Sequence, residues 1–134
     1  MSFGTIWKCN QCGFVTRTSG LWEYFIDEFG LRQKYGHPLP TSKAAKNAGV
    51  RGFSVQWYCP RCRSVRDVAV IEFDKAQPGS LGALGAYSFT DKPRQEFDPV
   101  CDKCGEKLKD DLEGELCPKC SLGHFVEEAR FMSK

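Results

Sequence analysis

The pattern of apolar and polar positions predicts two β-strands on either side of a short segment. Residues 53–58 alternate in part with the two-residue period of a strand, and residues 64–73 are dominated by strand-forming residues. The segment between them is short and contains Cys59-Pro60-Arg61-Cys62. The pattern therefore predicts a β-hairpin with this segment at its tip.

An earlier stretch has the spacing of an amphipathic helix. Its large apolar residues recur at intervals of three and four: Leu21, Trp22, Phe25, Ile26 and Phe29. These residues would share one face of a helix over residues 20–29, with acidic residues largely on the other face. Ser19 lies at the position of an N-cap for this helix.

A second, shorter helix is predicted over residues 43–48. Thr41 or Ser42 can cap its beginning, and Gly49 can end it. The preceding segment, His37-Pro38-Leu39-Pro40, cannot continue a helix because proline lacks the backbone donor and restricts the residue before it.

All eight cysteines of the chain occur in four Cys-x-x-Cys pairs. The pairs are Cys9/Cys12, Cys59/Cys62, Cys101/Cys104 and Cys117/Cys120. A tight turn with this spacing directs both sulfurs toward one ion, and four thiolates complete a tetrahedral zinc site. The chain therefore supplies ligands for two zinc ions. Because such sites leave no coordination position for water, catalysis at the metals is not expected.

The order of the pairs suggests which of them share an ion. Pairing neighbours along the chain gives one site of Cys9, Cys12, Cys59 and Cys62, and another of Cys101, Cys104, Cys117 and Cys120. This arrangement closes the short loop of residues 105–116 and so has the lowest entropic cost. Each site then combines one Cys-x-x-Cys-Gly motif with one Cys-Pro-x-Cys motif. A crossed arrangement, first pair with third and second with fourth, remains the alternative.

The four motifs resemble the metal-binding knuckles of zinc-ribbon and rubredoxin-like proteins. The resemblance lies in Cys9-Asn10-Gln11-Cys12-Gly13, Cys59-Pro60-Arg61-Cys62, Cys101-Asp102-Lys103-Cys104-Gly105 and Cys117-Pro118-Lys119-Cys120. It implies a double zinc ribbon with structural zinc, or a rubredoxin-like electron carrier with iron. Arg63 and Ser121 stand where that second family has glycine, and the 105–116 loop is shorter than in that family. Both departures favour zinc over iron.

The motifs and the periodicities together predict a small, metal-stabilised α+β fold. It would consist of two β-hairpin-rich four-cysteine modules, at residues 1–77 and 97–134, joined by a Gly-rich linker at residues 78–96. The first module would carry a helical insertion at about residues 17–50.

Charge is distributed unevenly along the chain. The formal net charge of +2 becomes −2 once two zinc ions are held by eight thiolates, so the protein as a whole is not basic. Residues 32–66, however, contain eight basic residues and no acidic ones. The candidate partner-binding residues are Lys43, Lys46, Arg51, Arg61, Arg63 and Arg66, with the aromatic residues Trp22 and Trp57. Cations beside aromatic rings are typical of surfaces that bind phosphates and stack bases.

These features favour a non-catalytic zinc-binding module associated with nucleic acid, of the kind that zinc ribbons form in transcription and translation. In a second interpretation the protein is a small accessory subunit that docks on a larger protein through its aromatic helix. A rubredoxin-like iron electron carrier is the third. The two histidines, His37 and His124, lie too far apart in sequence to indicate a hydrolytic metal site, and no small-molecule substrate is indicated. The N-terminal residues lack the apolar core of a signal peptide, and no stretch approaches the length of a membrane span, so we expect a cytoplasmic protein with reduced thiols.

Overall fold

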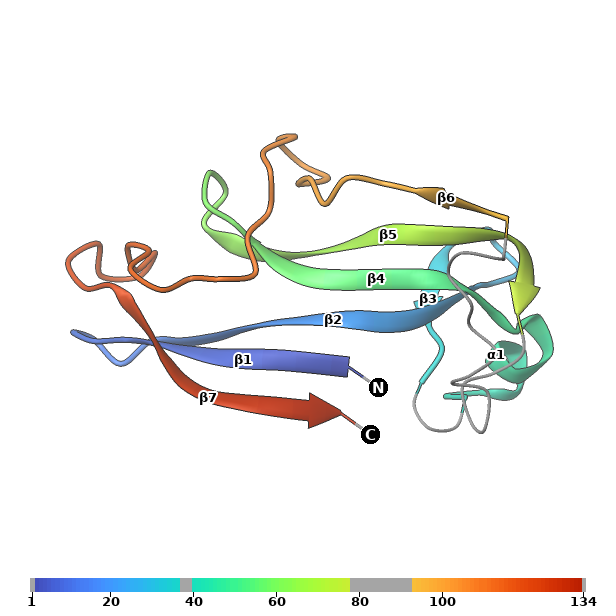
Figure 1. Cartoon of the computed structure of the whole chain (residues 1–134), viewed down its shortest axis with the longest axis horizontal. Coiled ribbons are helices and arrows are strands. Elements are labelled where there is room, and N and C mark those ends of the chain that lie inside the picture. The colour runs from blue at the N-terminus through green and yellow to red at the C-terminus, as the bar shows by residue number, and fades with distance from the viewer. Residues whose placement is uncertain (1, 37–39, 78–92, 134) are drawn as a thin grey trace.

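The computed structural model describes residues 2–36, 40–77 and 93–133, and the regular structure within these ranges is mostly antiparallel β-strand (Figure 1). The strands are β1 (Ser2–Cys9), β2 (Val15–Ile26), β3 (Arg32–Lys34), β4 (Val50–Cys59), β5 (Ser64–Gln77), β6 (Arg94–Glu96) and β7 (Phe125–Ser133). They form one sheet in the order β6-β5-β4-β2-β1-β7, and β3 pairs with the far end of β2. In the described ranges no helix has the length and apolarity needed to cross a membrane.

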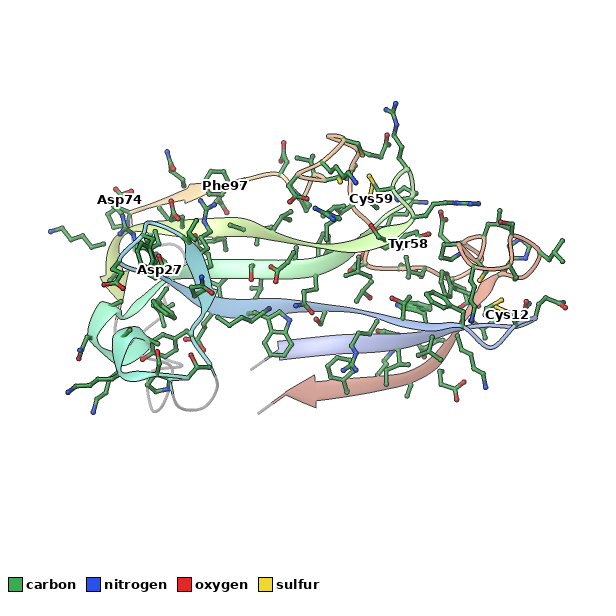
Figure 2. All side chains as sticks on the ribbon, turned by 180° about the vertical axis from the view of Figure 1, so that it is seen from behind. Cys12, Asp27, Tyr58, Cys59, Asp74 and Phe97 are labelled. Carbon is green, nitrogen blue, oxygen red and sulfur yellow. The ribbon has the colours of Figure 1, made fainter. Side chains whose placement is uncertain are left out.

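Two hairpins of this sheet carry the first two cysteine pairs at their tips. The β1–β2 hairpin turns at Cys9–Cys12. The β4–β5 hairpin turns at Cys59–Cys62 and confirms the hairpin that the sequence predicted there. Because β2 and β4 are antiparallel neighbours, both tips lie toward the same end of the sheet. Figure 2 shows Cys12, Tyr58 and Cys59 toward this end, and Asp27 and Asp74 toward the other.

The segment of residues 97–124 crosses the sheet at the cysteine-bearing end, from the β6 side to the β7 side (Figure 1). Its middle is fixed to β4 by two backbone hydrogen bonds of 2.8 Å that Tyr58 and Lys109 exchange. The hydroxyl of Thr18 accepts a hydrogen bond from Trp7 Nε1 at 3.0 Å and donates to the carbonyl of Asp110 at 2.8 Å. Leu112 is fully buried in a core formed with Trp7, Tyr58 and Phe125.

The helix predicted over residues 20–29 is wrong, because this stretch is strand β2 and the turn that follows it. Gly20 pairs with Val55 of β4, and Tyr24 pairs with β4 and β3. Hydrogen bonding of the backbone to strands on both sides outweighs the helical spacing of the apolar residues. Aromatic residues are also favourable in strands. The predicted helical insertion is therefore reduced to the six-residue helix α1 (Lys43–Ala48).

Helix α1 has the caps that its sequence predicted. The Ser42 hydroxyl accepts a hydrogen bond from the Ala45 amide at 3.1 Å, and Gly49, with φ of 75°, donates to the Ala45 carbonyl at 3.0 Å. Ala45 is fully buried against Phe25 and Val50. This small core lies at the end of the sheet opposite the cysteines (Figure 1). Residues 37–39 of the predicted loop lie outside the described residues.

Strands from both predicted modules share the one sheet. β7, from the predicted second module, pairs along most of its length with β1. Residues 94–96, which the predicted linker includes, form β6 and pair with residues 71–73 of β5. Residues 78–92 of that linker lie outside the described residues.

Gly52 is predicted to be essential to the packing of β2, β4 and β5. A Cβ atom at this position would collide with the carbonyl oxygen of Ile71 and lie 2.6 Å from the Tyr24 hydroxyl oxygen. Because one obstacle is backbone, we expect Gly52→Ala to lower the free energy of unfolding by about 3 kcal/mol. Thermal or denaturant unfolding followed by circular dichroism measures this change.

Gly114→Ala is the matched control for this substitution. Gly114 has φ of +80°, but a Cβ there would meet nothing within 4 Å. We expect Gly114→Ala to lower the free energy of unfolding by only about 1 kcal/mol, which is the cost of a Cβ atom at positive φ. Equal losses in the two variants would show that the crowding around Gly52 is unimportant.

Candidate metal centres

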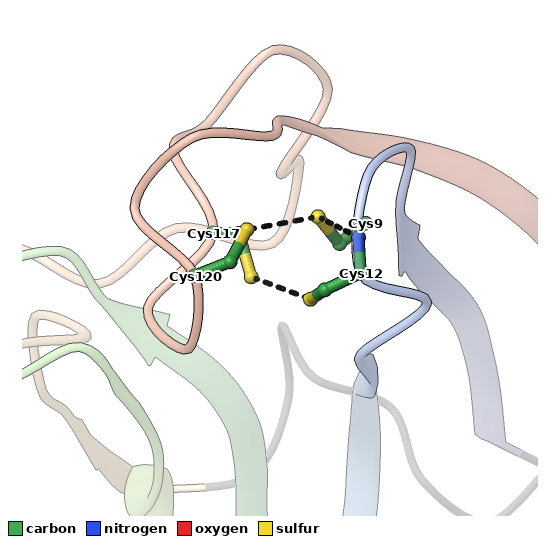
Figure 3. Close-up of side chains that lie close together, drawn as sticks. All are labelled: Cys9, Cys12, Cys117 and Cys120. Carbon is green, nitrogen blue, oxygen red and sulfur yellow. Dashed lines mark hydrogen bonds between the residues drawn. The ribbon is translucent and has the colours of Figure 1, made fainter.

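The eight cysteines form two separate groups of four. We call Cys9, Cys12, Cys117 and Cys120 the outer cluster, and Cys59, Cys62, Cys101 and Cys104 the inner cluster. Within each cluster all four sulfur atoms lie within 4.8 Å of one another. Figure 3 shows the outer cluster, in which the β1–β2 turn and the turn before β7 face each other.

The pairing of neighbouring cysteine pairs, predicted from loop length, is wrong. The first pair faces the fourth and the second faces the third, so the clusters are nested along the chain rather than adjacent or crossed. The strand order is the physical reason. Residues 101–104 follow β6 on the β4–β5 side of the sheet, whereas residues 117–120 precede β7 on the β1 side. The free energy of forming the sheet outweighs the small entropic advantage of the shorter loop.

The spacing of the sulfurs suits a tetrahedral metal ion. Facing sulfurs are 3.6 and 3.7 Å apart in the outer cluster, and 3.5 and 3.8 Å apart in the inner cluster. A zinc ion with Zn–S bonds of about 2.3 Å requires tetrahedral sulfurs to be separated by about 3.8 Å. Disulfide sulfurs would be only about 2.05 Å apart, and all eight cysteines are free. Four thiolates are a donor set that zinc or iron accepts.

Backbone amides stabilise the negative charge of these sulfurs. Cys9 Sγ accepts hydrogen bonds from the Gln11 and Cys12 amides at 3.4 and 3.5 Å. Cys59 Sγ accepts from the Cys62 amide at 3.2 Å, and Cys120 Sγ from the Gly123 amide at 3.3 Å. These donors offset the net charge of −2 that a divalent ion with four thiolates retains.

Without metal, the acidity of the thiols differs widely within each cluster. The Gly123 and Leu122 amides lower the pKa of Cys120 to about 6. Burial opposes ionisation of Cys101, but the Cys104 and Lys103 amides and the neighbouring thiols still lower its pKa to about 6. The hydrogen bond with Cys104, together with desolvation, raises the pKa of Cys62 to about 12. A metal ion must therefore displace protons from the less acidic thiols, and its affinity falls as pH is lowered.

The four knuckles share one backbone conformation after their second cysteine. Gly13 and Gly105 have φ of 78° and 79° there, as the glycine preference of such turns predicts. Arg63 and Ser121 occupy the equivalent places with φ of 59° and 58°. Residues with a Cβ atom adopt this left-handed conformation at a cost of about 1–2 kcal/mol. The tertiary structure thus imposes the knuckle turn on two residues that do not favour it.

The predicted basic segment is divided between the two ends of the sheet. Lys43 and Lys46 are exposed on α1, at the end away from the clusters, whereas Arg61 and Arg63 are exposed on the inner-cluster knuckle. Arg51, at the start of β4, donates from Nε to the Phe73 carbonyl at 2.8 Å.

Arg66 lies beside the inner cluster but is already paired. Its guanidinium forms two hydrogen bonds to the Asp102 carboxylate, of 2.8 and 3.1 Å. Through its hydrogen bonds and its charge, Arg66 lowers the pKa of Asp102. The pair fastens β5 to the third knuckle, next to Cys101.

The two predicted aromatic residues lie in different surroundings. Trp57 is half-buried and packs against the inner-cluster core of Cys59, Cys101 and Leu108. Trp22 donates from Nε1 to the Ser19 hydroxyl at 2.8 Å, and Lys34 Nζ lies 5.1 Å from the centre of its ring.

The partner-binding residues predicted from the sequence did not include two lysines that are exposed at the cluster end. Lys103 and Lys119 occupy the same place in their knuckles as Arg61, immediately before the second cysteine, and all three side chains are exposed. Aligning the four Cys-x-x-Cys motifs with one another would have revealed this shared position. The nested arrangement brings these cations to one end of the molecule together with Arg63.

Compared with known proteins, the chain matches no protein-family model, no curated protein and no solved structure. The geometry of the clusters therefore carries the functional conclusion. Two groups of four cysteines support structural metal binding.

Nested pairing makes a specific prediction for double cysteine variants. We expect Cys12→Ser/Cys120→Ser to remove ligands from the outer cluster alone and to retain one metal ion per chain. Cys12→Ser/Cys62→Ser disrupts both clusters and should retain none against a competing chelator. Elemental analysis of the purified proteins, or native mass spectrometry, measures the stoichiometry. Adjacent pairing would give the reverse result, and a wild type without two ions per chain would contradict both.

The left-handed residues after the second and fourth knuckles predict stabilising substitutions. Arg63→Gly and Ser121→Gly should each raise the free energy of unfolding by about 0.5–1 kcal/mol, because glycine adopts positive φ without the steric cost. Differential scanning calorimetry of the metal-loaded protein measures this gain. Ser64→Gly, in strand β5, is the matched control and should lower stability. A loss of stability in both knuckle variants would contradict the interpretation.

Proposed function

We propose that the protein is a non-catalytic binding module that two structural zinc ions hold together, and that it associates with nucleic acid through its cluster end. The observation that carries this proposal is the meeting of all four knuckles at one end of the sheet. Each cluster uses its four thiolates on the metal and leaves no open coordination position, which argues against chemistry at the ion. The metals instead fix a surface.

That surface is rich in exposed cations. Arg61, Lys103 and Lys119 occupy equivalent knuckle positions, and Arg63 follows the second knuckle. Neither Arg61 nor Arg63 has an ion-pair partner among the described residues, in contrast to Arg66. Trp57 packs against the inner-cluster core and is half-buried. Free cations at the same end of the sheet as a partly accessible aromatic residue suit the sugar–phosphate backbone and bases of a single strand.

Zinc fits the proposal better than iron. Arg63 and Ser121 lack the glycine of rubredoxin-like knuckles, and structural zinc is the ordinary occupant of closed four-cysteine sites. Iron in the same sites would make the oxidised protein red, whereas the zinc protein is colourless. The metal analysis that counts the ions also identifies them.

Affinity for a fluorescent single-stranded RNA of mixed sequence tests the nucleic-acid proposal. Fluorescence anisotropy at several salt concentrations gives the slope of log affinity against log salt. We expect Arg61→Ala/Arg63→Gly to weaken binding and to reduce that slope by about 1.4, because each lost phosphate contact contributes about 0.7. Glycine at residue 63 removes the charge without disturbing the left-handed turn.

The matched control is Lys43→Ala/Lys46→Ala, which removes the same charge from the opposite end of the sheet. It should leave the slope nearly unchanged. An absence of RNA and DNA binding at low salt, or an equal loss in both double variants, would overturn the proposal.

An accessory role in a larger assembly is the second candidate, and one turn favours it. Asp27 Oδ1 accepts hydrogen bonds from the Phe29 and Leu31 amides, both at 2.9 Å, which fixes the turn between β2 and β3. The side chains of Phe29 and Leu31 are nevertheless exposed, with relative accessibilities of 78% and 58%. An ordered turn that presents apolar side chains suits a protein partner. Affinity capture from native lysate with and without nuclease distinguishes the two candidates, because only a protein complex survives nuclease.

A further inference from the structure

Strands β2, β1 and β7 lie side by side and meet the outer cluster at one end (Figure 1). Near that end their side chains alternate strictly between the two faces of the sheet. Trp7 and Phe125 are buried on one face, whereas Lys8 and Val126 are exposed on the other. We call the exposed side of these three strands the outer face. Its exposed side chains leave it open to a partner.

The outer face presents a row of aliphatic side chains around a lysine. Lys8 pairs with Val15 of β2 on one side and with Val126 of β7 on the other, and paired residues of antiparallel strands share a face. Two residues before Val126, His124 pairs with Leu116 on the same face. The exposed fractions are 53% for Val15, 41% for Leu116 and 37% for Val126. These side chains form one apolar patch beside the outer cluster.

A second cation lies on the outer face, and neither cation is neutralised there. Arg17 is exposed two residues after Val15 on β2, and its guanidinium lies 6.0 Å from the centre of the Phe131 ring. Neither Lys8 nor Arg17 forms an ion pair with a described residue. The residues aligned on this face include no carboxylate, since Glu128 is the extra residue of the bulge and is aligned with none. The outer face is therefore cationic as well as apolar.

The opposite face of the same strands has the reverse charge. Trp7 and Thr5 point to that side, where they line a hollow of about 550 Å³. Apart from these two and Arg130, the residues that line it are all acidic: Asp110, Asp111, Glu113 and Glu127. The three strands thus have a cationic, aliphatic face and an acidic face. Such a division of charge would orient the protein on an anionic surface.

The turn before β7 adds a projecting apolar side chain. Leu122 is 80% exposed, although its turn is fixed. The Gly123 amide donates to Cys120 Sγ at 3.3 Å, and a Cβ atom at Gly123 would collide with Cys9 Sγ. Lys119, in the same knuckle, is also exposed. An ordered turn therefore holds a leucine outward near a cation.

We propose that the outer face and the Leu122 turn form a docking surface for an anionic lipid bilayer. Cations without carboxylates complement anionic headgroups. The valines on both sides of Lys8 suit the boundary with the acyl chains, and the long lysine side chain can reach a phosphate from between them. Association with a bilayer surface requires no membrane-spanning helix. This surface does not depend on the nucleic-acid role or on Arg61 and Arg63.

Two other anionic partners fit the outer face less well. Its exposed apolar side chains are aliphatic, so they offer no rings on which the bases of a single strand could stack. An acidic amphipathic helix would bury its apolar side in a groove. The row of Val15, Lys8 and Val126 is instead flat, because directly paired side chains stand side by side. A bilayer requires no groove.

Co-sedimentation of the metal-loaded, nuclease-treated full chain with large unilamellar vesicles tests the proposal. We expect binding to vesicles of phosphatidylcholine mixed with phosphatidylserine, and little binding to phosphatidylcholine alone. Lys8→Gln/Arg17→Gln should weaken binding to the mixed vesicles by about 25-fold, because each cation near an anionic surface contributes about fivefold in affinity. Leu122→Ala should weaken it by about tenfold, because less apolar surface leaves water.

Matched variants at the other end of the sheet are the controls. Lys43→Gln/Lys46→Gln removes the same charge, and Leu31→Ala truncates another exposed leucine. Both should bind the mixed vesicles like the wild type, and native mass spectrometry should find two metal ions per chain in every variant. An absence of binding to mixed vesicles at low salt, a binding that Leu122→Ala leaves unchanged, or equal losses in the control variants would overturn the proposal.

Discussion

The meeting of eight cysteines in two nested groups of four is the constraint on which the rest of the structure depends. The outer cluster joins Cys12 to Cys117, 105 positions apart, and the inner cluster joins Cys62 to Cys101, 39 positions apart. Between them they fix the crossing segment of residues 97–124 to the ends of both hairpins. A structural zinc site contributes about 10–16 kcal/mol, which is comparable to or larger than the whole net stability of an ordinary domain.

The need for such strong cross-links follows from the architecture. The described strands form a single sheet, and the clusters of buried apolar residues on it are small and lie toward its two ends. The group at the far end involves α1, whereas Trp7, Tyr58, Leu112 and Phe125 lie at the cluster end. Metal ions held in the two clusters would compensate for a core of limited size by closing the crossing segment over the sheet.

The same constraint decides which side chains the cluster end displays. Four thiolates around an ion would leave no coordination position open, so the proposed binding role rests on those side chains. Arg61, Lys103 and Lys119 reach the surface from three different knuckles, which the two cysteine groups bring to one end of the sheet. Strand β7 belongs to the same framework, since it leaves the outer cluster and forms an edge of the sheet.

The sequence by itself determined the elements whose chemistry is local. The eight ligands, the hairpin of residues 53–73 and the caps of α1 all follow from patterns within a few residues. The combination of one glycine-type and one proline-type motif per cluster also holds in the structure. It excludes the crossed arrangement, but adjacent and nested pairings satisfy it equally, so it could not choose between them.

Only the tertiary structure decided the features that depend on distant partners. Residues 20–29 carry apolar residues at intervals that suit a helix, and they became largely a strand because β1, β3 and β4 supply backbone partners. The basic segment is continuous in sequence, but the ten residues of β4 separate its two halves by about 30 Å. The cysteine pairing follows the strand order across the sheet rather than the order of the chain. In each case the deciding free energy comes from contacts between segments far apart in sequence, which no local pattern records.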